Sequence, residues 1–198
     1  NVYYHYINED FYIDVGGSGK SYGRTDIIIR QTSDSDGAIA YKFTYETDHP
    51  IASTKECYAD KEMTKLLVTY TYYFLDSGRI ATKSLPSPDS QGVITYEYAN
   101  EDFQGQGYGR VISVRRATAD QNGMMAYRYY YSTNDPLRII AKICSPTYRG
   151  GDSNLAYSFY DDAANRMMSK YYYRGAKDSS GNVYYHYINE DFYIDVGG

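Results

Sequence analysis

The clearest pattern along the chain is a pair of aromatic residues separated by one polar residue. An alternation of period two places the aromatic rings on one face of a β-strand and the polar side chains on the other face. The pattern therefore predicts six half-buried strands, spaced roughly 30 residues apart. These strands contain the structural aromatic pairs Tyr4 and Tyr6, Tyr41 and Phe43, Tyr70 and Tyr72, Tyr96 and Tyr98, Tyr127 and Tyr129, and Tyr157 and Phe159.

Return strands and turns are predicted between these aromatic strands. "RIATK" (79–83), "RIIAK" (138–142) and "RMMSK" (166–170) are examples of the return strands. The recurring Asp-x-x-Gly motif predicts turns, because Asp accepts hydrogen bonds from backbone amides and Gly tolerates a positive φ. The turn glycines are Gly37, Gly92, Gly123 and Gly181. No segment has the sustained apolar spacing of a capped amphipathic helix.

The chain also begins and ends with the same 17 residues, "NVYYHYINEDFYIDVGG", at positions 1–17 and 182–198. The two copies start at residues 1 and 182, so the period is 181 residues. We expect a window on a longer tandem array, in which residues 182–198 are the start of the next copy.

Each period is itself two diverged halves. "NEDF" at 8–11 recurs at 100–103, and "YGR" at 22–24 recurs at 108–110. We expect a first pseudo-repeat half at residues 1–92 and a second at 93–181, each with three hairpin units.

The expected fold class is all-β, with antiparallel β-hairpin repeats and about 12 strands per period, stacked as a solenoid, a spiral or a filament. A closed β-barrel-like meander is the alternative. A single hairpin cannot bury its apolar face alone, so neighbouring units must cover it. Tyrosine suits this packing, because its large ring is buried while its hydroxyl reaches water.

Composition narrows the class of protein. The chain has 28 Tyr, no Trp, 17 Gly and a net charge of −5. The acidic excess argues against nucleic acid as a partner, and no apolar stretch approaches the roughly 20 residues of a membrane span. The Tyr-rich, turn-rich composition favours an extracellular or cell-surface location.

Sites for chemistry are weak in this sequence. "DVGGSGKS" (14–21) resembles a phosphate-binding loop, but Asp14 stands where that loop needs its first Gly. The acidic groups at 8–10, 100–102 and 34–37 lack the spacing of a calcium-binding loop, and turn chemistry explains them without metal.

His5, repeated as His186, and His49 form no catalytic or zinc-binding set with other residues. We therefore expect no catalytic residue, no metal site, no cofactor and no enzymatic activity.

The two cysteines, Cys57 and Cys144, occupy equivalent places in the two halves. One interpretation is a disulfide, within one period or between adjacent periods. The other is a pair of small buried residues that stay reduced.

Two units resemble YD (RHS-type) repeats, whose pattern is Y-x-Y-D-x-x-G-R-L. They are "YTYYFLDSGRIATK" (70–83) and "YSFYDDAANRMMSK" (157–170), where Asn165 replaces the Gly before Arg. In that family, β-hairpins coil into spirals, shells or stalks of secreted and surface proteins. The first unit also looks like choline- or glucan-binding hairpins, but those bind ligands with Trp, which this chain lacks.

The function that we expect is structural: an extracellular β-rich filament or stalk, whose partners are further copies of the same repeat. A carbohydrate- or surface-binding repeat module, with glycans as partners, is the second hypothesis. The third follows the resemblance and is a YD-repeat shell or stalk of a toxin-delivery protein. A binding module predicts a stable single period that takes up ligand saturably, whereas a filament predicts that isolated periods polymerise or fold poorly.

Overall fold

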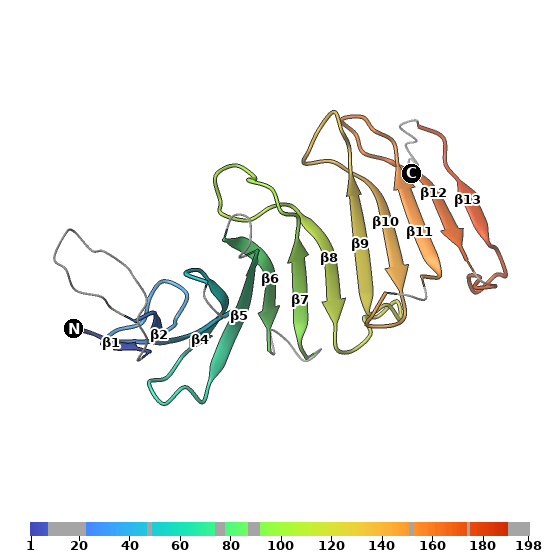
Figure 1. Ribbon diagram of the computed structural model, residues 1–198. Helices are drawn as coiled ribbons and strands as arrows, with labels where there is room; N and C mark the ends of the chain where they lie inside the picture. Colours follow the sequence, from blue (N-terminus) through green and yellow to red (C-terminus); the bar gives the residue numbers. More distant parts are fainter. Residues whose placement is uncertain are drawn as a thin grey trace, which may run out of the picture. The chain divides into compact units, whose positions relative to one another are not determined.

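The computed structural model describes residues 1–7, 23–46, 49–73, 78–86, 92–150, 153–173 and 175–189. They form an all-β antiparallel sheet of thirteen strands, in which each strand pairs with the next in chain order (Figure 1). The strands are β1 (Val2–Tyr6), β2 (Thr25–Arg30), β3 (Ala40–Tyr45), β4 (Ala52–Tyr58), β5 (Leu66–Tyr73), β6 (Arg79–Leu85), β7 (Ile94–Tyr98), β8 (Val111–Arg116), β9 (Ala126–Tyr131), β10 (Ile139–Ser145), β11 (Leu155–Phe159), β12 (Met167–Tyr172) and β13 (Tyr184–His186).

The prediction of an antiparallel meander is confirmed. Twelve of the described strands lie in the first period, and β13 lies in the repeated segment. The aromatic pairs of the first period lie on the odd-numbered strands β1 to β11, with the return strands between them. Because β1 and β13 stand at opposite ends of the strand order, the meander is open and the alternative of a closed barrel is not seen.

The chain divides into two compact units, Asn1–Val111 and Ile112–Gly198, and each is described by itself. The predicted repeat boundaries after residues 92 and 181 concern internal duplication, and they stay predictions.

Each unit has a small core on the face of the sheet that carries the aromatic pairs. In the first unit the buried residues are Ala38, Tyr41, Cys57 and Val68. In the second unit they are Tyr127, Cys144 and Leu155. The pairing places Tyr41 opposite Cys57 and Cys57 opposite Val68, and the same relation holds for the second set. Equivalent residues of the two halves therefore build equivalent cores.

The opposite face carries hydroxyl groups that pair across neighbouring strands. Thr71 and Thr82 lie 2.7 Å apart between their oxygen atoms, and Ser84 and Thr95 lie 2.9 Å apart. Such cross-strand hydrogen bonds satisfy these partly buried hydroxyl groups and stabilise the pairing of neighbouring strands. The alternation along each strand thus separates an aromatic face from a hydroxyl-bearing face.

Three of the four Asp-x-x-Gly turns share one hydrogen-bonding pattern, and residues 89–91 of the fourth lie outside the described residues. The Oδ1 atom of Asp34 accepts hydrogen bonds of 2.9 Å from the amides of Asp36 and Ala38. Asp120 and Asp178 make the same two kinds of bond in their turns. The four turn glycines have positive φ, with values of 84° at Gly37, 76° at Gly92, 76° at Gly123 and 85° at Gly181.

The sequence did not reveal a further turn of this kind, because its last position is not glycine. Asp60 accepts hydrogen bonds from the amides of Thr64 and Lys65, and Met63 has a φ of 56°. A side chain in this left-handed region is strained.

Replacing Gly37 by Ala should lower the free energy of unfolding by about 1–2 kcal/mol, because a β-carbon disfavours the left-handed conformation. A β-carbon added at Gly37 would have no other atom within 4 Å, so the cost comes from the backbone. Urea unfolding measures it. Met63→Ala is the matched control: it keeps a β-carbon at positive φ and should cost clearly less. Equal losses for the two variants would contradict this account.

Candidate functional site

Lysines lie between the aromatic rings in the first unit. In β4, Lys55 pairs with Phe43 of β3 on one side and with Tyr70 of β5 on the other. In β6, Lys83 lies between Tyr70 and Tyr96 in the same way. The Lys55 Nζ atom is 4.7 Å from the centre of the Tyr41 ring.

The second unit repeats this arrangement. Lys142 of β10 pairs with Tyr129 and Tyr157, and Lys170 of β12 pairs with Tyr157 and Tyr185. The Nζ atom of Lys142 is 4.2 Å from the ring centre of Tyr127. We call these two rows of alternating aromatic and lysine side chains the lysine–tyrosine face.

This face differs from the dry aromatic core that alternation alone suggests. Each of the four lysines is half-buried, and its Nζ atom lies between 4.2 and 6.0 Å from the centre of a tyrosine ring. A cation over an aromatic ring contributes about 0.5–1 kcal/mol at such partly exposed sites. The signal in the sequence was the final Lys of "RIATK", "RIIAK" and "RMMSK", which recurs at one strand position.

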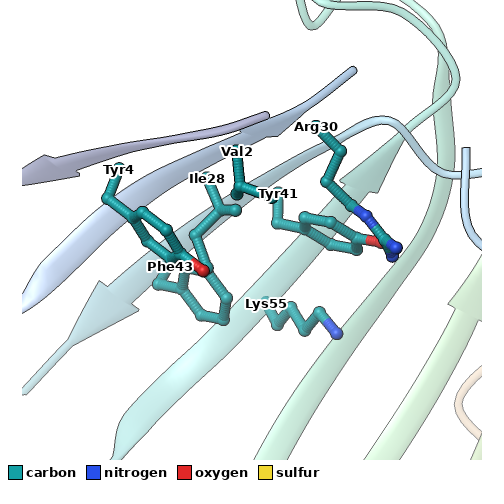
Figure 2. Close-up of a pocket in the computed structure, with 7 residues that line it drawn as sticks. All are labelled: Val2, Tyr4, Ile28, Arg30, Tyr41, Phe43 and Lys55. Atoms are coloured by element: carbon teal, nitrogen blue, oxygen red, sulfur yellow. The ribbon is translucent and has the colours of Figure 1, made fainter. Parts of the chain in front are cut away.

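A shallow, open hollow lies on the first unit near β1 (Figure 2). Its volume is about 330 Å³, and it is lined by Val2, Tyr4, Ile28, Arg30, Tyr41, Phe43 and Lys55. The Tyr41 hydroxyl donates a hydrogen bond to Asp34 and accepts one of 3.4 Å from Arg30. Two polar groups of the hollow, those of Arg30 and Tyr41, are therefore already engaged in hydrogen bonds.

Cys57 and Cys144 are free thiols, each buried in the core of its own unit. Burial raises the pKa of the Cys144 thiol to about 11, and it also raises the pKa of Cys57. The disulfide stays a prediction.

Three arginine side chains link a hairpin to the one that follows it. Arg138, before β10, donates a hydrogen bond of 2.7 Å to Asp161, which follows β11. Arg79 of β6 reaches Asn100 after β7, and Arg166 before β12 reaches Asn189 after β13, at 3.4 and 2.6 Å. We call these contacts the arginine clasps.

Tyrosine hydroxyls make a second link across an intervening strand. Tyr73 of β5 donates a hydrogen bond of 2.7 Å to the carbonyl of Tyr98, the last residue of β7. Tyr160 donates one of 2.8 Å to the carbonyl of Tyr187, and Tyr187 follows β13. Each bond passes over one return strand and joins two successive aromatic strands.

The repeated segment thus docks as an internal unit does. In the first unit β6 and β7 pair with Lys83 opposite Tyr96, and in the second unit β12 and β13 pair with Lys170 opposite Tyr185. Both junctions also contain an arginine clasp and a tyrosine bond. Residues 182–189 therefore pack within the second unit as residues 93–100 pack within the first.

The recurrence of "YGR" has a steric cause. A β-carbon at Gly23 would lie 1.8 Å from the carbonyl oxygen of Ile7, and one at Gly109 would lie 2.1 Å from that of Ala99. Only glycine permits this close approach of two backbones.

The remaining predicted site residues take part in local structure. Residues 8–22, which include the loop resembling a phosphate-binding loop, lie outside the described residues. In the acidic group at 100–102, Glu101 forms two hydrogen bonds with the Arg110 side chain, of 2.6 and 2.8 Å. His5 contacts Asp26 at 2.6 Å, and His49 accepts a hydrogen bond from the amide of Ile51.

Within the described ranges, no three His, Cys, Asp or Glu side chains gather in a way that could hold a metal ion. No helix in that part of the chain is long and apolar enough to span a membrane. No protein-family model matches the chain. A search of curated proteins also finds no match.

Both thiols should resist alkylation at about pH 8 in the folded protein, because burial and a raised pKa leave little thiolate. After unfolding without a reductant, iodoacetamide should modify both cysteines, as intact mass spectrometry would show. A protein that is labelled only after reduction would instead contain the disulfide.

The arginine clasp between Arg138 and Asp161 should weaken in acid, because it is the clasp with a carboxylate partner. Hydrogen bonds from Ser132, then from Arg138, lower the pKa of Asp161, and one from Asn189 lowers the pKa of Asp162, both below the ordinary value of 3.8. Depressed carboxyl pKa values stabilise the folded state fully above the ordinary value, and this stabilisation is lost as the pH falls through the native values.

Urea unfolding from about pH 5 to about pH 2 should therefore show a falling midpoint. The fall should be smaller in Asp161→Asn, which has no charge to lose at this clasp. Glu62→Gln, at an exposed turn position, is the control and should follow the unmodified protein. An unchanged acid profile for Asp161→Asn would refute the role of this clasp.

Proposed function

We propose that the protein is a structural tandem-repeat protein that forms an extracellular β-rich filament or stalk. The observation that carries the proposal is the docking of residues 182–189 on β12. This segment has the sequence that begins a period, and its register and side-chain links match those of an internal junction. A chain of several periods would then form one continuous series of hairpins.

The energetics of the sheet favour this function. The described residues provide only a few fully buried side chains in each unit, so much of the stability comes from strand pairing with neighbours. In such repeats, stability is approximately a sum of unit terms and nearest-neighbour terms, and it rises as units are added. Length and mechanical continuity are therefore the properties that repetition of this unit supplies.

The extracellular location rests on composition, and the spiral or solenoid course of the hairpins rests on the resemblance to YD repeats. The carbohydrate-binding module remains the second hypothesis. The lysine–tyrosine face favours it, because half-buried tyrosine rings offer flat surfaces for sugar rings.

A chain of two consecutive periods tests the filament proposal against the single period. We expect the two-period chain to unfold at a higher urea concentration, because its junction adds a nearest-neighbour interface. Arg166→Ala at the internal junction should remove about 1 kcal/mol of this gain, since it breaks a clasp. Arg149→Ala, at an exposed position, is the matched control.

Two periods that unfold independently, at the midpoint of the single period, would contradict the proposal. If the single period also took up an oligosaccharide saturably in calorimetry, the binding module would replace the filament as the better explanation.

A further inference from the structure

The repeated sequence forms two strands, β1 and β13. β1 pairs with β2 through one edge, and β13 pairs with β12 through the other edge. At the two ends of β1, the Asn1 carbonyl accepts a hydrogen bond from the Gln31 amide, and the Ile7 amide donates one to the Arg24 carbonyl. In the repeated segment, the Val183 carbonyl and the Tyr187 amide bond to Tyr172 and Met168, at the two ends of β12.

These bonds come from alternate residues of one sequence. Val183 and Tyr187 correspond to Val2 and Tyr6, whereas the bonds towards β2 come from Asn1 and Ile7. Successive residues of a strand direct their backbone groups to opposite edges. The edge that holds β12 is therefore not the edge that holds β2, and one strand can pair with both.

It follows that β13 presents away from β12 the same backbone groups that bind β2 in β1. Tyr184 and His186 are the counterparts of Tyr3 and His5, which pair with Ile29 and Ile27. Among the described strands β13 is the last in the sheet order, and an outer strand edge is a template for a further strand.

The strand that pairs with β2 within one chain is β1, and it is largely exposed. All five residues of β1 are exposed, and Tyr3 and Tyr4 keep 56% and 50% of their accessible surface. Displacing β1 therefore uncovers only about half of the surface of these two tyrosines. An identical strand that takes its place restores the same pairings.

We propose that a second copy of this chain binds at the outer edge of β13, where its β2 pairs with β13 in place of its own β1. The exchange replaces one set of contacts with an identical set. The conformational entropy that the displaced strand gains offsets part of the entropy that is lost when two chains associate. The interface is heterologous, so it repeats from chain to chain and builds a linear polymer.

The proposal fixes a register. Tyr184 lies opposite Ile29 of the second copy, and Tyr185 lies opposite Ile28 of the second copy, as Tyr3 and Tyr4 do within one chain. His186 then meets Asp26 of the second copy, which repeats the 2.6 Å contact between His5 and Asp26. This inference rests on the proposed filament, and it adds that separate chains can join without a covalent link.

Cross-linking of the full chain tests this register. Ile29→Cys and Tyr184→Cys are combined in one chain, which is prepared with ¹⁴N and with ¹⁵N, mixed, and equilibrated in a glutathione buffer at rising protein concentrations. We expect a disulfide between positions 29 and 184 in peptides of mixed isotope content. Non-reducing electrophoresis should show a ladder with steps of 22.7 kDa.

The matched control is Ile28→Cys with Tyr184→Cys. Neighbouring residues of a strand point to opposite faces, so the mixed-label disulfide should be at least about tenfold less abundant than with position 29. Tyr3→Cys with Ile29→Cys should close within one chain and shows that the engineered pair can form. The native thiols are buried and do not compete.

The inference is overturned if the Tyr3–Ile29 pair closes while the 29–184 pair yields no mixed-label disulfide, or yields no more than the 28–184 control. The two-period chain described above separates this failure from that of the filament. If the two-period chain is stabilised but separate chains do not exchange strands, the proposal of a covalent array stands and only the proposal of strand exchange fails.

Discussion

Pairing of each strand with its neighbours in the chain is the interaction on which this structure depends. The described residues form one layer of strands, and each unit buries only a handful of side chains completely. Backbone hydrogen bonds, partly exposed rings and links between hairpins must therefore supply the stability that a packed second layer supplies elsewhere. The arginine clasps and the tyrosine bonds meet this same need. A clasp joins the start of a return strand to the end of the aromatic strand that follows, and a tyrosine bond joins two successive aromatic strands.

The lysine–tyrosine face shows how an incompletely covered aromatic surface stays compatible with water. Lys55 and Lys142 place their charged Nζ atoms over the rings of Tyr41 and Tyr127, at 4.7 and 4.2 Å from the ring centres. Fully apolar residues at these positions would cover the rings more completely, but they would create a large exposed apolar patch that favours aggregation. The lysines also separate the aromatic rows of adjacent odd-numbered strands. The face is thus partly core and partly solvated surface.

Much of the fold could be predicted from the sequence, because its signals are local. The period-two alternation located the aromatic strands, and the Asp-x-x-Gly motif located turns such as that of Gly37. The clasps were not predictable, because the register that brings Arg79 to Asn100 or Arg138 to Asp161 depends on pairing between distant residues. The turn at Met63 was missed since its side chain gives no sign of a positive φ. The close approach at Gly109 appeared in the sequence only as an unexplained repeat of three letters.

The order of the strands has a mechanical consequence. In a meander, tension on the chain ends loads the outermost strand first, and its hydrogen bonds to the next strand open one after another. Hairpins can then open one after another, and the clasp and tyrosine bond at the β6–β7 and β12–β13 junctions raise the force that is needed to open them. A sheet built in this way would lengthen stepwise under tension and dissipate energy at each step, so that it would be extensible and not rigid.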